Sequence, residues 1–133
     1  MLTPALLLWL HTCCAAYGVE PAFALAVAQV ESGCPGQEIR LGPLGKKGVY
    51  AGPFGLHRAY CREHFGVDPV DPEVNIAIGV RALRGPDKRS ILRRYNTEWN
   101  RAYEQAVMTR YQSLNSMCAG RTADENQKKE AVE

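Results

Sequence analysis

The sequence predicts a small, mostly α domain that carries one long Gly-rich loop or short β-ribbon. Three observations support this fold class. Six segments are predicted to be helical, from cap residues at their ends or from the helical spacing of their apolar side chains. Residues 33–52 hold six glycines and two prolines, a composition that no helix tolerates. The length of 133 residues and the apolar fraction of 46% suit one domain with one core.

The first helix is expected over residues 4–17. Thr3 is a suitable N-cap, Pro4 fits the first helical position and Gly18 is a typical C-cap. Residues 2–10 are apolar enough to suggest a secretion signal, but no Lys or Arg precedes them. The run is also too short to cross a bilayer. We therefore interpret the segment as the first helix of the fold, and we expect no export signal and no membrane span.

The second helix should cover residues 21–31, and its apolar side chains on nearly every face predict that it is largely buried. The Gly-rich segment follows, with Val49–Tyr50 as a possible strand. Residues 119–133 are polar and mixed in charge. We expect a domain over residues 1–118 and a disordered tail over residues 119–133. Four further helices are expected over residues 54–65, 72–84, 87–95 and about 99–117.

Composition narrows the classes of function. The net charge is +2, from 16 basic and 14 acidic side chains, which lacks the basic excess of a nucleic-acid-binding domain. The five cysteines have no zinc-ligand spacing and are interpreted as reduced, mostly buried thiols. Cys34 with Cys61 is the first pair to test if the protein meets an oxidising space. The three histidines share no ligand spacing, so no metal site is expected.

Glu31 is the candidate catalytic carboxylate because it ends the apolar second helix. Partial burial there would raise its pKa, and a carboxyl group that is protonated near neutral pH can act as a general acid. A carboxylate at the C-terminal end of a helix also opposes the helix dipole. The alternative interpretation is a helix-end glutamate that points into water.

Four short segments occur in a characteristic order. They are AVAQVESG at 26–33, AGPFGL at 51–56, DPEVNIAIGVRAL at 71–83 and RYN at 94–96. This ordered set resembles the soluble lytic transglycosylases of the lysozyme-like superfamily. In that family a helix ending in Glu-Ser is followed by a Gly-Leu-Met-Gln type segment, an Asn-Ile-x-x-Gly helix and a Tyr-Asn pair. The resemblance runs from about Pro4 to Tyr111 and implies a lysozyme-like helical domain.

The resemblance implies a role for each matching position. Glu31 matches the family's catalytic carboxylate, and Tyr95 matches the tyrosine whose hydroxyl lies against it. Asn75 and Gly79 lie on one helix face, where Asn75 should bond to backbone and Gly79 should permit a close helix approach. The residues expected to contact substrate are Ser32, Tyr50, Gly52, Phe54, Gly55 and Asn96.

One position departs from the pattern of the family, and two aromatic residues are interpreted as lying outside the site. Gly55 stands where the family commonly has Gln, so a substrate-facing amide is lost. Trp99 and Tyr103 are interpreted as packing groups rather than site residues.

The implied reaction cleaves the β-1,4 bond between N-acetylmuramic acid and N-acetylglucosamine in peptidoglycan. Glu31 first protonates the glycosidic oxygen and then takes a proton from the sugar's own 6-hydroxyl, which closes a 1,6-anhydro ring. Internal attack benefits from a high effective molarity. One carboxylate therefore serves both steps, and no metal or organic cofactor is needed. Glu38 is the candidate for a second carboxylate, as most glycosidases use two.

Two alternatives stay open at the level of sequence. One is a muramidase that uses water in host lysis and leaves reducing ends. The other is a catalytically inactive wall-binding or virion structural module, which the missing Gln at Gly55 motivates. The expected setting is a bacteriophage particle that acts in the bacterial periplasm during genome delivery, with other virion proteins as possible partners. A secreted or periplasmic bacterial enzyme is the alternative setting.

Overall fold

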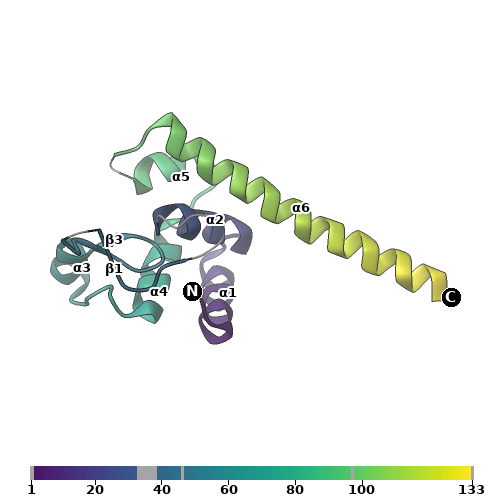
Figure 1. Cartoon of the computed structure of the whole chain (residues 1–133), viewed down its shortest axis with the longest axis horizontal. Coiled ribbons are helices and arrows are strands. Elements are labelled where there is room, and N and C mark those ends of the chain that lie inside the picture. Colours follow the sequence, from purple (N-terminus) through teal and green to yellow (C-terminus); the bar gives the residue numbers. More distant parts are fainter. Residues whose placement is uncertain (1, 33–38, 46, 97, 133) are drawn as a thin grey trace.

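The structure, a computed structural model, describes residues 2–32, 39–45, 47–96 and 98–132, with side-chain surroundings through residue 117. Within these ranges the chain forms six helices and a small three-stranded antiparallel sheet (Figure 1). This architecture confirms the predicted mostly α class with a short β-ribbon. In chain order the elements are α1 (Pro4–Tyr17), α2 (Pro21–Glu31), β1 (Pro43–Leu44), β2 (Tyr50–Ala51), β3 (Leu56–His57), α3 (Arg58–Phe65), α4 (Pro72–Ala82), α5 (Lys88–Tyr95) and α6 (Arg101–Val132).

Local capping signals set the boundaries of the N-terminal helices. The Thr3 hydroxyl accepts a backbone N–H from the first turn of α1, and Gly18 ends this helix in the left-handed conformation at φ 69°. The Asp71 carboxylate accepts two first-turn N–H groups of α4. α1 packs against α4, and the Trp9 indole N–H donates to the Glu73 carbonyl at 2.9 Å. The predicted helices at 4–17 and 21–31 are confirmed.

The first two strands lie within the Gly-rich segment, and β3 follows it. β2 pairs with both neighbours, so that Tyr50 lies opposite Leu44 on one side and His57 on the other. The predicted strand at Val49–Tyr50 is displaced by one residue, to Tyr50–Ala51.

The helix predicted from residue 54 is wrong over its first four residues, which form a turn and β3, so that α3 begins at Arg58. Gly52 and Gly55 take left-handed backbone angles of φ 74° and 57°, which end any helical path there. Both backbone groups of Phe54 are also bonded to distant side chains. Its N–H donates to Asn75 Oδ1 at 3.0 Å, and its carbonyl accepts from the Tyr95 hydroxyl at 2.6 Å.

The core forms where the inner faces of α1, α2, α4 and α5 meet the turn before β3. Phe54 is fully buried, and its ring lies directly on Gly79 of α4. A Cβ at Gly79 would come within 2.2 Å of the Phe54 ring, so the predicted close approach at Gly79 admits a loop side chain and not another helix. The other large, fully buried apolar side chains are Phe23, Leu10, Ile76, Leu83, Leu92, Val27, Val80 and Val107.

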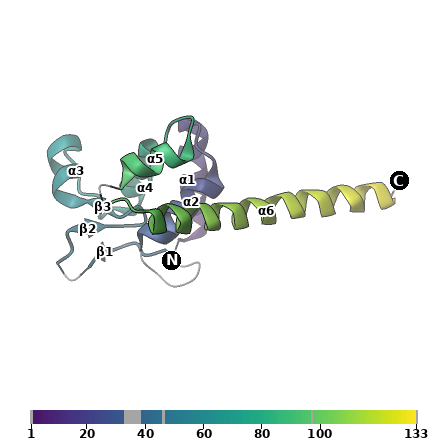
Figure 2. The ribbon, with the colours of Figure 1, turned by 90° about the horizontal axis from the view of Figure 1, so that it is seen from above.

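α6 packs its N-terminal part against α2 and then extends away from the body of the molecule (Figures 1 and 2). The sequence predicts a disordered tail after residue 118, whereas the structure continues α6 as one helix through Val132. Residues 119–132 contain Ala, Glu, Gln and Lys, which have high helix propensity, so the segment is helical without apolar anchors.

Two further expectations concern cysteines and membranes. Cys13, Cys14 and Cys61 are buried free thiols. Cys34 lies outside the described residues, and Cys61 is a free thiol, so the Cys34–Cys61 pair stays a prediction. Across the described part of the chain, each helix is either too short or too polar to cross a bilayer.

Candidate functional site

Glu31 is the last residue of α2, and its carboxyl group lies against α6. The Tyr103 hydroxyl donates to Glu31 Oε1 at 2.5 Å. Burial raises the pKa of Glu31 from its ordinary value of 4.5 to about 7, and the Tyr103 hydrogen bond opposes part of this rise. The carboxyl group therefore changes its protonation state near neutral pH, as the sequence predicts for a residue at this position.

The second carboxylate oxygen of Glu31 lies beside Gly55. A Cβ added at Gly55 would come within 2.8 Å of Oε2 and 3.3 Å of the Glu31 Cβ. Gly55 also has a left-handed φ of 57°, which disfavours any side chain. Glycine at this position thus has a structural reason, because the backbone itself approaches the carboxylate here.

The turn that carries Gly55 is held in place by Asn75, which is fully buried on α4. Its amide nitrogen donates to the carbonyls of Ala51 and Pro69 at 2.7 and 2.9 Å, and its oxygen accepts the Phe54 N–H at 3.0 Å. This confirms the predicted role of Asn75 in binding backbone groups. Because buried amides are costly to leave unpaired, these three bonds fix the turn before β3 against α4.

Tyr95 does not donate to Glu31, which corrects the expectation from the resemblance. Its hydroxyl donates instead to the Phe54 carbonyl at 2.6 Å, one residue before Gly55. Burial, and next the charge of Glu31, raise the pKa of Tyr95 well above its usual range, so Tyr95 is a neutral donor close to the carboxylate. Tyr95 therefore positions the turn beside Glu31.

Tyr103 makes the contact that the sequence assigns to Tyr95. Burial, followed by the charge of Glu31 and the hydrogen bond to it, holds the pKa of Tyr103 far above its usual range, so its phenol stays protonated and donates. Tyr103 does pack against the core, as the sequence predicts, and its hydroxyl in addition bonds Glu31. Tyr103 and Tyr111, eight residues apart on α6, donate to Glu31 and Glu20 respectively, and no local sequence pattern marks either contact.

Three of the predicted substrate-contacting residues are turned inward. Ser32 is buried and its hydroxyl donates to the Gln29 carbonyl at 3.5 Å. The Phe54 ring is in the core, so it is not a sugar-stacking surface. Gly52 lies against Asn75, where a Cβ would come within 2.1 Å of the amide nitrogen. All three positions contact buried groups, and none of them presents a side chain to a substrate.

The other predicted substrate contacts differ in exposure. Tyr50 on β2 is 44% exposed and makes an edge-to-face contact with His57, with ring centroids 5.4 Å apart. Its ring is therefore open to a ligand. Asn96 follows α5, and its side-chain oxygen accepts the Glu98 N–H at 2.9 Å, so it caps the loop that leads to α6.

Ion pairs of the buried Glu104 carboxylate with two half-exposed arginines join the helices that carry the two tyrosines. Glu104 of α6 is 7% exposed in its side chain and bonds Arg89 of α5 at 2.9 Å, with Arg93 at 3.6 Å. Arg93 also lies over the Trp99 ring at 5.1 Å. Removal of the arginines would leave the Glu104 carboxylate buried without its partners, so this contact holds α5 and α6 in a defined relation.

Other acidic groups have structural partners. Asp68 bonds Arg58 and Arg62, and Asp71 caps α4. Glu38 lies outside the described residues. In the part of the chain described here, no three His, Cys, Asp or Glu side chains gather as a metal site would require.

Comparisons of this chain with family models, with curated proteins and with solved structures find no match. Its functional assignment therefore rests on its own residues and geometry.

Proposed function

We propose that the chain is a peptidoglycan lytic transglycosylase, which cleaves the bond between N-acetylmuramic acid and N-acetylglucosamine with Glu31 as acid and then base. The observation that supports this most directly is the Glu31 carboxyl group, which is partly buried, has a pKa raised to about 7 and lies between Tyr103 and Gly55. A group that titrates near neutrality can both give and accept a proton at the same pH.

The two carboxylate oxygens of Glu31 have different neighbours, which suggests different roles in the reaction. Oε1 accepts the Tyr103 hydroxyl, which orients the carboxyl group. Oε2 lies next to Gly55, whose backbone approaches it so closely that an added Cβ would come within 2.8 Å. We assign the transferred proton to Oε2, because Oε1 already accepts the Tyr103 hydroxyl.

The reaction then needs no second carboxylate. Glu31 donates its proton to the glycosidic oxygen as the bond from that oxygen to the muramic C1 breaks. The muramic 6-hydroxyl oxygen bonds to C1, and its proton passes to the ionised Glu31. The products are a free 4-hydroxyl on N-acetylglucosamine and a 1,6-anhydromuramic end, and the enzyme regains its starting protonation state. Tyr103 is a positioning residue throughout, because its phenol keeps its own proton.

The proposed setting is a bacteriophage particle that opens the wall from the periplasmic side during genome delivery. This part of the proposal is tested separately, by detection of the chain in purified particles after gradient centrifugation. Its recovery only in host lysates would assign it instead to lysis.

The experiment for the activity uses purified sacculi and mass spectrometry of the released muropeptides. Wild-type protein should release fragments with 1,6-anhydromuramic ends, and Glu31→Gln should release none while its circular dichroism matches wild type. The matched control is Glu63→Gln on exposed α3, which should retain full activity. Reducing ends in place of anhydro ends would make the enzyme a muramidase. A folded wild-type protein that releases nothing would refute the proposal and favour a wall-binding module.

A further inference from the structure

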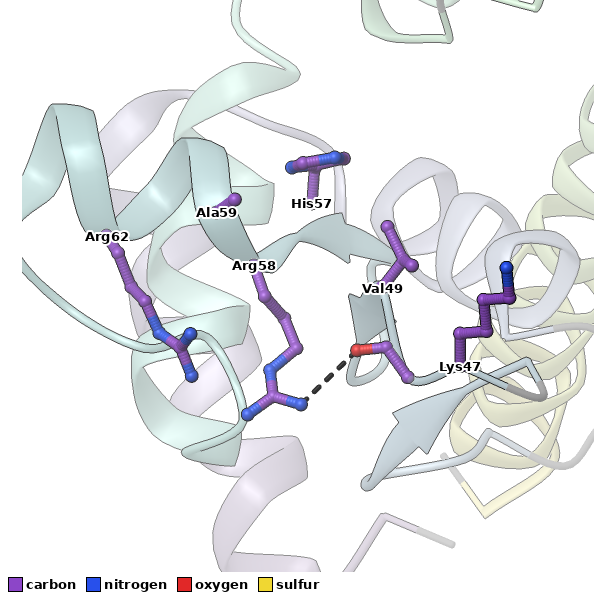
Figure 3. A pocket seen from close by; sticks show the side chains of 7 residues that line it. Lys47, Val49, His57, Arg58, Ala59 and Arg62 are labelled. Carbon is purple, nitrogen blue, oxygen red and sulfur yellow. Dashed lines mark hydrogen bonds between the residues drawn. The ribbon is translucent and has the colours of Figure 1, made fainter.

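A surface hollow of about 360 Å³ lies beside the sheet, at residues that the Glu31 chemistry does not use (Figure 3). Its walls come from the loop before β2 (residues 47–49), from the end of β3 and from the start of α3. Seven residues line it: Lys47, Gly48, Val49, His57, Arg58, Ala59 and Arg62.

The charge of this hollow is strongly one-sided. Lys47, Arg58 and Arg62 are cationic, and none of the seven lining residues is acidic. Asp68 forms ion pairs with both arginines and supplies a single negative charge to them. One arginine charge and the Lys47 charge are therefore not balanced by Asp68. This local excess stands out in a chain whose total net charge is only +2.

Arg58 is held in a fixed position at the base of the hollow. Its Nε and Nη2 donate to the two oxygens of Asp68 at 3.3 and 3.0 Å, and its Nη1 donates to the Gly48 carbonyl at 3.2 Å (Figure 3). Its side chain is only 27% exposed. A guanidinium group fixed in this way can receive an anion with little loss of side-chain freedom.

Arg62 is the more open of the two arginines. Its side chain is 56% exposed, and it bonds Asp68 through Nη2 at 2.6 Å. A guanidinium group has five N–H donors, so Arg62 keeps donors in addition to the one that Asp68 accepts. Lys47 is exposed on the opposite wall, which the loop before β2 provides (Figure 3).

We propose that this hollow binds an oxyanion, a carboxylate or phosphate group, of the polymer whose glycan reaches Glu31. The link to that polymer rests on the proposed function; the oxyanion site itself does not. The two sites share one hairpin, because His57 lines the hollow and Gly55, two residues earlier, touches Glu31.

The binding test uses protein-detected NMR titration, which requires no activity. The probes are inorganic phosphate and N-acetyl-D-alanine, with the uncharged N-acetyl-D-alanine amide as a negative control. Saturable shifts of the backbone amides of residues 47–49 and 57–62 are expected with at least one anion. In the double variant Lys47→Gln/Arg62→Gln the affinity should fall about fivefold, which is ~1 kcal/mol. The matched control Arg101→Gln removes the same type of charge from outside the hollow and should bind as wild type.

The outcomes separate the source of the anion and the validity of the site. Tighter binding of N-acetyl-D-alanine indicates peptide carboxylates, and tighter binding of phosphate indicates a phosphate-bearing wall polymer. Absence of saturable shifts with both anions, or equal shifts in the double variant, would overturn the proposal. Both results are independent of whether the protein cleaves glycan.

A kinetic test then asks whether the site serves the proposed reaction. On sacculi with intact peptide stems, the double variant should show a KM raised about fivefold with kcat unchanged, as expected for loss of uniform binding. On glycan strands freed of stems by an amidase, the variant and wild type should be equal if the anion is a stem carboxylate. A fall in kcat on both substrates would overturn the role of the hollow as a binding site for the polymer.

Discussion

Replacement of Glu31 by Gln should stabilise the fold while it abolishes the proposed activity. The native pKa of about 7 lies above the value of 4.5 that the group has when solvated. Between these two values the native state keeps a proton that the unfolded chain has released. Wild-type stability therefore falls as the pH rises through this window, and the loss is complete above the native pKa.

The magnitude follows from the same two values. A pKa that rises from 4.5 to about 7 corresponds to an upper bound of about 3 kcal/mol, since each pKa unit is worth about 1.4 kcal/mol. Gln keeps an oxygen for the Tyr103 hydroxyl but has no charge to bury. The stability of Glu31→Gln relative to wild type should thus increase by about 2–3 kcal/mol between pH 5 and pH 8.

The assay is urea unfolding followed by circular dichroism at pH 5 and pH 8, for wild type and Glu31→Gln. The control is Glu63→Gln, an exposed carboxylate on α3, whose difference from wild type should be nearly the same at both pH values. A difference between Glu31→Gln and wild type that does not change with pH would refute the argument. It would mean that the Glu31 carboxylate is solvated and is not poised for proton transfer.

Three further substitutions test the surroundings of the carboxylate. Tyr103→Phe removes a hydrogen bond that lowers the pKa of Glu31, so the midpoint of the pH–rate profile should move upward, with about 1–3 kcal/mol lost in unfolding free energy. Gly55→Ala should lose about 1–2 kcal/mol from its left-handed backbone, and most of the activity, because the new Cβ meets Glu31 Oε2 at 2.8 Å. Asn75→Ala should lose about 3 kcal/mol or more, since it leaves buried backbone groups around Phe54 unpaired.

Each of these substitutions has a specific comparison. Gly66→Ala is the match for Gly55→Ala, because Gly66 has φ 68° and nothing within 4 Å of an added Cβ. It should lose similar stability and retain activity, and equal inactivation of both variants would contradict the contact with Glu31. For Tyr103→Phe, an unchanged pH–rate profile would show that the phenol does not tune the carboxylate. For Asn75→Ala, a loss below about 1 kcal/mol would show that water replaces its bonds.

Local signals in the sequence predict most of the helices. The caps at Thr3 and Asp71 and the C-terminal Gly18 act within a few residues of the helix ends, so the pattern along the chain is sufficient. Glu31 is predictable in the same way, because it ends an apolar helix and its burial follows from that helix. Asn75 is also predictable, since a buried amide on an apolar helix needs backbone partners.

Long-range contacts explain what the sequence does not reveal. Residues 54–57 have a helical pattern, but Asn75 and Tyr95 bind the backbone of Phe54 from positions 21 and 41 residues away. The exchange of roles between Tyr95 and Tyr103 has a similar cause. Tyr103 reaches Glu31 only because α6 packs along α2, and no local pattern fixes the register of that packing.

The register of α6 on α2 also has a consequence for the order in which the site is assembled. The two tyrosine–glutamate bonds join positions 72 and 91 residues apart, and Arg110 bonds Gln29 across 81. During synthesis from the N-terminus, Glu31 leaves the ribosome long before Tyr103. The nascent chain therefore has a carboxyl group without its phenol, free to stay solvated and ionised. The hydrogen bond from Tyr103 to Glu31 forms only after α6 has been made and has docked on α2, so the complete site arises late in synthesis.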